Sequence, residues 1–341
     1  MMMADSTERT DGLRISVVVP VKDEEESIRA LLDALLKQAR RADEIVITDG
    51  GSTDRTTDII EEYARTGAPL RLIRAGAALP GRGRNLAAAQ ATSDWLAFID
   101  AGTRPSADWI ASLAERVEHD PTVDVVFGAW EPRVESFFEE CAAVAYAYES
   151  PVERDGVLIS PPCIGSSLVR RRVWREVGGF AEDLRSGEDI LFMEKIDRRK
   201  FRVAYAPRAV VRWDAPPTLW LTFKRFAIYS RHNLRAGLWR DWHATVLGRY
   251  ALLLVALLAA LAFGTKWISV VTALWLLMLA ARAVAASYRK RGVIKSGRGR
   301  GALRLFALVP LIATIDAATI LGALHWLLVD KLRLLRGGAT K

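Results

Sequence analysis

The chain has 341 residues, of which 51% are hydrophobic, so it can bury the core of one large domain or of two. Its net charge of +8 hides an asymmetry, because residues 1–215 carry a balance of −8 and residues 216–341 a balance of +16. An acidic front part and a basic, apolar back part favour a soluble domain followed by a membrane domain. The front part has no basic patch interleaved with aromatic residues, which argues against a nucleic-acid partner.

Two features of the front part indicate its compartment. Cys141 and Cys163 stand far apart and form no CxxC pair, which suits a reducing compartment and excludes a zinc cluster built on thiolates. Residues 1–12 are polar and acidic without an apolar core, so we expect a disordered start rather than a signal peptide. The domain that follows is therefore expected in the cytosol.

The first hundred residues alternate β-branched runs with amphipathic helices. Strands are expected over 13–21, 43–48, 70–74 and 94–100, and helices over 22–36 (with its acidic residues in the first turn), 55–65 and 85–91. Such alternation predicts a mainly parallel α/β sheet with right-handed crossovers. Asp49 and Asp100 each follow a strand, so we expect both at the sheet edge where open α/β sheets bind ligands.

The pattern is less regular between residues 105 and 215. We expect helices over 107–118, 134–149, 170–177 and 186–199, and strands over 123–130, 161–169 (after a loop), 201–205 and 209–213. Together with the first hundred residues these elements predict one α/β domain over 13–215.

The remaining chain predicts a membrane domain. Residues 216–243 mix aromatic and basic side chains, as in an interfacial amphipathic helix on anionic lipid. Residues 244–341 contain three apolar runs that predict about three transmembrane helices, over 245–263, 267–287 and 305–329.

The charge distribution allows two placements of the last of these three runs in the membrane. The positive-inside rule places the basic loop 288–304 in the cytosol, and a simple third span would then put the basic tail 331–336 outside. A re-entrant or kinked segment would keep that tail inside. Asp316 lies in this run, where it is either functional or paired with a basic neighbour.

Five short motifs, in order and spacing, resemble those of family 2 inverting glycosyltransferases with the GT-A fold. They are Pro20-Val21-Lys22-Asp23-Glu24-Glu25, Thr48-Asp49-Gly50-Gly51-Ser52-Thr53-Asp54, Gly83-Arg84-Asn85, Asp100-Ala101-Gly102, and the pair Gly178-Gly179-Phe180 with Gly187-Glu188-Asp189. The resemblance covers roughly residues 14–240 and implies a GT-A domain (Rossmann-like, with a mainly parallel sheet) followed by an all-α membrane domain.

The resemblance also implies a function. It predicts a membrane-anchored enzyme that moves a single sugar from a nucleotide-diphosphate donor to a lipid or cell-envelope acceptor. The expected location is the cell membrane, with the catalytic domain on the cytosolic face. Inverting transfer is a single displacement, which needs a carboxylate to accept the acceptor's proton and a divalent cation to stabilise the departing diphosphate.

Site roles follow from the same motifs by resemblance. The nucleotide-sugar site is expected to use Pro20, Val21, Glu24, Asp49, Arg84, Asn85 and Asp100; the catalytic pair is Asp189, the general base, with Glu188; the acceptor side is Gly178, Gly179 and Phe180. Asp100 is the expected ligand of Mg²⁺ or Mn²⁺. Simpler roles compete with these, because an acidic first turn also favours a helix dipole and a Gly pair also ends a helix.

Departures from the family pattern keep alternatives open. Gly102 stands where the metal motif has a second carboxylate, and Lys22-Asp23 replace Tyr-Asn of the first motif. The QxxRW motif of processive synthases is missing, the nearest stretch being 223–226, which favours transfer of one sugar. The alternatives are a processive polysaccharide synthase and a catalytically inactive scaffold that binds a nucleotide sugar.

Overall fold

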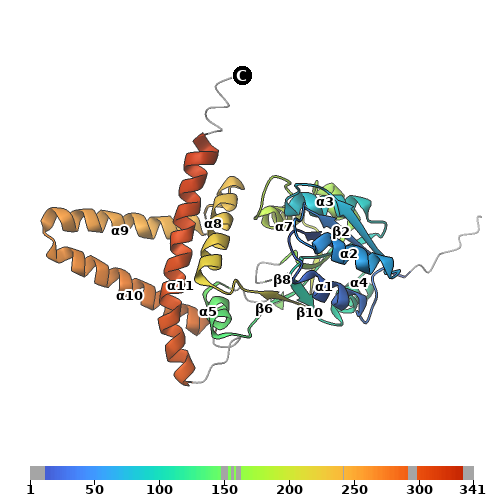
Figure 1. Cartoon of the computed structure of the whole chain (residues 1–341), viewed down its shortest axis with the longest axis horizontal. Coiled ribbons are helices and arrows are strands. Elements are labelled where there is room, and N and C mark those ends of the chain that lie inside the picture. The colour runs from blue at the N-terminus through green and yellow to red at the C-terminus, as the bar shows by residue number, and fades with distance from the viewer. Residues whose placement is uncertain are drawn as a thin grey trace, which may run out of the picture. The chain divides into compact units, whose positions relative to one another are not determined.

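The computed structural model describes residues 12–146, 153–154, 157–158, 163–240, 242–290 and 298–332. These residues form two compact units (Figure 1). The first holds the described residues of Met1–Trp130, Glu149–Glu182 and Phe192–Arg212; the second holds those of Glu131–Tyr148, Asp183–Leu191 and Trp213–Lys341. The domain boundaries expected at 13–215, 216–243 and 244–341 stay predictions, and residues 1–11 lie outside the described part.

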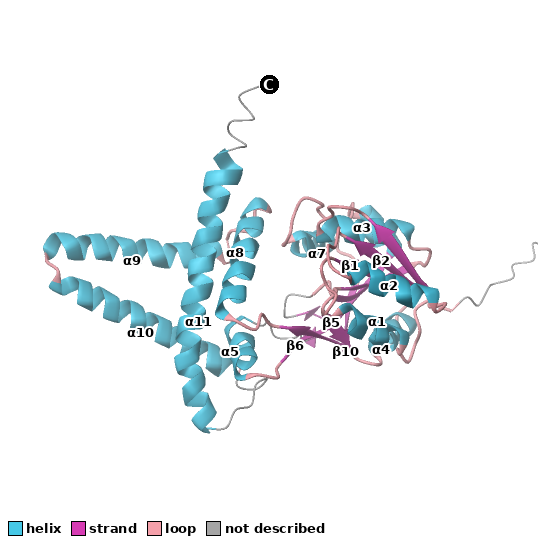
Figure 2. Ribbon diagram, in the orientation of Figure 1, coloured by secondary structure: helices cyan, strands magenta, loops and turns pink. Residues whose placement is uncertain are grey.

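An eight-stranded sheet runs through the first unit in the order β3-β2-β1-β4-β9-β6-β10-β5 (Figure 2). Its strands are β1 (Ile15–Val21), β2 (Glu44–Asp49), β3 (Leu70–Arg74), β4 (Trp95–Ile99), β5 (Thr103–Pro105), β6 (Val125–Arg133), β9 (Ser166–Arg170) and β10 (Val203–Asp214). A separate two-stranded ribbon pairs β7 (Glu153–Arg154) with β8 (Val157–Leu158). The helices of this part of the chain are α1 (Ile28–Leu36), α2 (Thr56–Arg65), α3 (Pro80–Gln90), α4 (Trp109–His119), α6 (Arg171–Glu176) and α7 (Glu188–Arg198).

The pairing of the strands confirms the predicted mainly parallel arrangement for the first half of the sheet. β1 lies between β2 and β4 and is parallel to both, and β2 is parallel to β3. β9 runs antiparallel to β4 and to β6, so the sheet as a whole is mixed. The two strands predicted over 201–205 and 209–213 are instead one strand, β10. Pro207 lies in it at an exposed position, where a missing N–H is tolerated.

Burial of nearly every residue in β1 and β4 explains why helices cover both faces of the sheet. In β1 and β4, one set of alternate residues packs with α1, α2 and α4 around the fully buried Trp109. The other set, including Val18 and Phe98, packs with α3, α6 and α7. Successive side chains of a strand point to opposite faces, so an uninterrupted apolar strand serves two cores at once.

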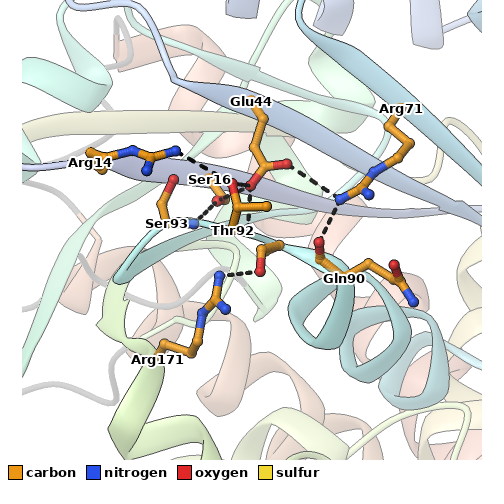
Figure 3. Close-up of polar contacts among 9 residues, drawn as sticks. Arg14, Ser16, Glu44, Arg71, Gln90, Thr92, Ser93 and Arg171 are labelled. Atoms are coloured by element: carbon orange, nitrogen blue, oxygen red, sulfur yellow. Dashed lines mark hydrogen bonds and ion pairs between the residues drawn. The ribbon is translucent and has the colours of Figure 1, made fainter.

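The amino ends of the strands are tied by a polar network around Glu44 (Figure 3). Its carboxylate accepts hydrogen bonds from Ser16 Oγ and Thr92 Oγ1, each at 2.7 Å, and from an Arg71 guanidinium nitrogen at 3.3 Å. Burial acts to raise the pKa of Glu44, but these hydrogen bonds outweigh it and hold that pKa below its usual value. The network stabilises the edge opposite to the predicted ligand edge.

The second unit is helical. Its helices are α5 (Phe137–Tyr146), α8 (Leu219–Arg235), α9 (His243–Phe263), α10 (Lys266–Arg289) and α11 (Arg298–His325), which continues as a π-helical turn, η1 (Trp326–Lys331). Gly264, at a φ of 122°, ends α9 and lets the chain reverse into α10. The segments 243–263, 266–289 and 300–331 are long and apolar enough to cross a membrane. Of the helix predicted over 134–149, residues 147–149 lie outside the described part.

Asp316 of α11 joins three helices of this unit. It is fully buried, and both of its oxygens accept hydrogen bonds from the Arg282 guanidinium of α10. The Tyr250 hydroxyl of α9 donates to Oδ2 of the same carboxylate at 3.1 Å. The structure therefore gives Asp316 a basic partner, which is one of the two alternatives open from the sequence. We call Tyr250, Arg282 and Asp316 the polar knot.

Candidate active site

The first two motifs are hydrogen-bonded to each other beyond the carboxyl ends of β1 and β2. Backbone N–H of Asp23 donates to Ser52 Oγ at 2.9 Å, and N–H of Thr53 donates back to Asp23 Oδ1 at 2.8 Å. Glu24 N–H donates to Thr56 Oγ1 at 2.7 Å. Asp23 holds a φ of 52°, a conformation that Asp tolerates better than most residues. These reciprocal bonds make one rigid rim from two separate segments.

Asp49 is the last residue of β2 and is only 4% exposed. The parallel register places it beside Val21, and Thr48 beside Pro20. Its carboxylate accepts N–H of Gly51 at 3.2 Å and N–H of Ser52 at 3.0 Å. Each carboxylate oxygen has a second lone pair, so Asp49 can still accept a hydrogen bond from a ligand.

Arg84 and Asp100 form an ion pair at the carboxyl end of β4. A guanidinium nitrogen of Arg84, whose side chain is 5% exposed, lies 2.5 Å from Asp100 Oδ1. Asp100 Oδ2 lies against Gly165, where a Cβ would stand only 2.9 Å away, so a larger residue at 165 would displace the carboxylate. Asp100 itself is one-third exposed. The buried Arg84 guanidinium therefore holds the partly exposed Asp100 carboxylate in one orientation.

Gly102 leaves room for a second carboxylate beside Asp100. It has a φ of 76°, and a Cβ built on it would lie 3.2 Å from Glu24 Oε2. The Glu24 carboxylate, which accepts a hydrogen bond from Ser27 Oγ, therefore lies against the backbone two residues after Asp100. Its position puts a carboxylate oxygen beside residue 102, which itself has no side chain.

The donor atoms at this edge suit Mg²⁺ or Mn²⁺. Such hard cations take oxygen ligands and commonly use one or two carboxylates together with substrate phosphates and water. Asp100 and Glu24 supply that donor type. In the described ranges no three His, Cys, Asp or Glu side chains group to hold a metal alone. The residues fit a cation that is shared with a diphosphate.

Asn85 of α3 holds the segment that contains the predicted acceptor-side glycines. Its Oδ1 accepts N–H of Phe180 at 2.9 Å and the indole N–H of Trp174 at 3.1 Å. Its Nδ2 donates to the carbonyl of Phe180 and to Glu182 Oε1, each at 2.9 Å. A Cβ at Gly179 would lie 2.5 Å from Asn85 Oδ1, so this residue must be glycine for the contact to exist.

Aromatic side chains connect the same segment to β4 and to the first-unit part of α7. Phe180 stacks on Phe192 with ring centroids 4.0 Å apart, and packs edge-on against Phe98 at 5.3 Å. The Arg84 guanidinium lies 5.4 Å from the centre of the Phe180 ring. The aromatic cluster thus links the strand that ends before Asp100 to the acceptor-side segment and to the helix on which Phe192 lies.

Glu188 and Asp189 begin α7. Glu188 is 4% exposed and Asp189 is half-buried, with Oδ1 accepting N–H of Ile190 at 2.8 Å. In the second unit, the segment before them is bound to the end of α8, where Arg185 N–H donates to His232 Nδ1 at 3.0 Å. Burial lowers the pKa of His232 to about 4, so its ring is neutral and can accept this bond.

The structure gathers most of the residues that the sequence assigned to the site. In the first unit it brings together Pro20, Val21, Glu24, Asp49, Arg84, Asn85 and Asp100 at the carboxyl edge of β1, β2 and β4, with Gly178, Gly179 and Phe180 bound to Asn85. Glu188 and Asp189 belong to the second unit. Sequence reasoning missed Gly165, for which the sole signal was a single glycine before a strand. It also missed the contacts of Asn85 with Phe180, which lies 95 positions away in the chain.

Comparison with known proteins gives a family match and several relatives for this chain. Residues 16–176 match the family model described as Glycosyl transferase family 2. The pre-mycofactocin glycosyltransferase of Mycobacterium tuberculosis is 28% identical over 233 residues, which cover 62% of this chain and 45% of that protein. Glycosyltransferase AglE of Haloferax volcanii is 25% identical over 221 residues, 63% of this chain and 71% of that one. The chain spans about half the length of the first of these relatives.

A solved structure supports the fold. The mannosyltransferase PcManGT from Pyrobaculum calidifontis, in complex with GDP-Man and Mn²⁺, superposes with a TM-score of 0.52 at 22% identity, over 94% of this chain and 88% of that one. A likeness at this identity concerns the fold alone. Together with the sheet described above, it confirms the expected GT-A-like domain followed by a helical part.

Proposed function

We propose that this chain, which belongs to glycosyl transferase family 2, transfers one sugar with inversion from a nucleotide-diphosphate donor to a lipid or cell-envelope acceptor at the cytosolic membrane face. The observation that carries the proposal is the edge at the ends of β1, β2 and β4. There, motif segments separated by up to 80 residues of sequence form one rim, and the buried Arg84 orients Asp100.

The donor would bind along this rim. Asp49 and the backbone of Pro20 and Val21 would hold the nucleoside, and Arg84 with Asn85 would lie near the diphosphate. Asp100, with Glu24 as a second oxygen donor, would hold Mg²⁺ or Mn²⁺. The cation, when bound, offsets the negative charge of the departing diphosphate.

Asp189 would be the general base. It would accept the proton of the acceptor hydroxyl as that oxygen attacks the anomeric carbon and the bond to the diphosphate breaks. Glu188 beside it places a second carboxylate at the start of α7, where the helix dipole stabilises negative charge. The binding of residues 183–187 to α8 would fix where α7 begins.

The test is nucleotide release by the detergent-purified full chain with a panel of nucleotide sugars, UDP-GlcNAc and GDP-mannose included, with and without Mn²⁺. We expect turnover of one donor, loss without the metal, and a fall of roughly 10²–10⁴-fold in Asp189→Asn. Asp197→Asn is the matched control, because this residue lies on the same helix and is 84% exposed.

Three results would contradict parts of the proposal. Wild-type turnover by Asp189→Asn would remove the base from the mechanism. Turnover unchanged in Asp100→Asn and without Mn²⁺ would remove the cation. Binding of a donor without release, even after addition of a membrane lipid extract, would favour the inactive scaffold.

A further inference from the structure

We propose that the α9–α10 hairpin is the part of the chain that enters the bilayer, and that α11 lies along the membrane surface together with α8. By length and composition α11 could cross a membrane as well as α9 and α10 can. Its surroundings argue otherwise. The proposal rests on the membrane association that forms part of the proposed function, and it decides which helices provide that association.

α8 lies lengthwise against α11. Ser230 Oγ of α8 donates to the carbonyl of Thr319 at 2.7 Å, and a Cβ at Gly322 would overlap the carbonyl of Ala227. Further along, two guanidinium nitrogens of Arg231 bind the Asp330 carboxylate at 2.7 and 2.9 Å. Figure 1 shows α8 running beside α11 for most of its length. The two helices must therefore share one environment.

α8 is too polar for the hydrocarbon. Its 17 residues include Lys224, Arg225, Arg231 and Arg235, and Lys224 is exposed. A Lys or Arg at the centre of the membrane costs about 2.5–3.5 kcal/mol on insertion scales. If α11 crossed the bilayer, it would carry Lys224 and Arg225 toward its middle. On the surface, the same cations meet lipid headgroups, and the exposed Trp220 (60%) enters the interface.

The hairpin meets α11 at its base alone. Leu279 and Ala283 of α10 pack on Leu308 and Ile312 of α11, and the polar knot lies at the same level. Figure 1 shows α11 running across the open end of the hairpin instead of along it. Helices that cross a bilayer side by side would be packed together over their whole depth.

Beyond the polar knot the hairpin is apolar and exposed. Residues 251–281 hold a single charged residue, Lys266, which lies at the tip. The side chains of Leu252 and Phe263 are 72% and 80% exposed. From Tyr250 to the tip, and from the tip to Arg282, the helices reach about 20–24 Å at 1.5 Å per residue. With the polar knot at the headgroups, this length crosses most of a ~30 Å core, and Lys266 can extend to the far side.

Charge agrees with this placement. Arg289 and Lys290 precede α11 in the chain, Arg304 lies in its first turns, and Lys331 ends η1, which continues α11. A spanning α11 would separate these basic groups onto opposite faces of the membrane. A surface α11 keeps all of them on one face, as the positive-inside rule favours.

The test is labelling with a membrane-impermeant maleimide in cells that express the full chain, with Cys141 and Cys163 replaced by Ala. Single cysteines are placed at the start of α11 (Gly301→Cys), just after η1, which continues α11 (Leu332→Cys), and at the hairpin tip (Thr265→Cys). We expect both α11 positions to react after permeabilisation only, and the tip to react in intact cells or to be protected by lipid. Ala302→Cys and Lys331→Cys serve as a second pair if the first does not accumulate.

Two outcomes would overturn the inference. One is reaction of the two α11 ends from opposite sides of the membrane, which means that α11 spans. The other is reaction of the hairpin tip from the same side as both α11 ends, or release of the chain from membranes by carbonate. Neither result depends on turnover, which the nucleotide-release assay measures separately, so failure of the topology and failure of the proposed reaction are distinguishable.

Discussion

Asn85→Ala is expected to destabilise the first unit more than substitution of an exposed polar residue of α3. The change removes the acceptor for Phe180 N–H and for the Trp174 indole, and the donor to the Phe180 carbonyl. Each such bond contributes about 0.5–1.5 kcal/mol net, so losing three gives a cost of about 1.5–4.5 kcal/mol. The bond to Glu182 is exposed and adds little.

The assay is thermal unfolding of the detergent-purified full chain, followed by tryptophan fluorescence. For a unit of this size we expect Tm to fall by roughly 5–15 °C. Gln90→Ala is the matched control, since this side chain lies on the same helix and is exposed, and its carbonyl contact with Arg71 is retained. Asn85→Asp keeps both accepted bonds but turns an oxygen toward the Phe180 carbonyl, so it should be nearly as damaging at neutral pH. A Tm for Asn85→Ala within a degree or two of the control would refute the reasoning.

Three further predictions concern other parts of the chain. Gly102→Ala should lower stability by about 1–3 kcal/mol, because its φ is 76° and the new Cβ would lie 3.2 Å from the Glu24 carboxylate. Gly67→Ala, with a φ of 81° and open space, should cost less, and an equal loss of Tm would contradict the contact. Asp316→Asn or Arg282→Leu alone should cost about 3–5 kcal/mol in thermal unfolding, since each disrupts a buried ion pair, whereas replacing both by Leu should recover most of the loss. Equal losses in single and double variants would argue against the pair. His232 has a folded pKa of about 4, below its unfolded value, so the unfolded state binds more protons and stability should fall by up to about 3 kcal/mol as pH drops from 6.5 to 4. His232→Gln should flatten that part of the Tm-against-pH curve, and an unchanged slope would show that another group is responsible.

Sequence patterns predicted the elements that depend on local chemistry. The strands ending at Asp49 and Asp100 were expected from apolar runs followed by turn residues, and β1, β2, β3 and β4 are parallel as the alternation required. The edge at which the motif residues gather follows directly, because parallel strands point their carboxyl ends the same way. The local pattern was wrong at Pro207, where it predicted a break between two strands and the structure has the single strand β10.

The pairings between distant residues were decided by the tertiary structure. Arg84 with Asp100, Asn85 with Phe180, and Asp316 with Arg282 join separate elements, and no periodicity within one segment encodes such a partner. The same holds for α11: hydropathy alone made it a third span, whereas the polar helix packed along it argues for the membrane surface. Burial periods and turn propensities are properties of a few neighbouring residues, so a sequence determines them directly. The pairing of charges between elements depends on how the complete elements pack. The environment that two packed helices share depends on the same packing.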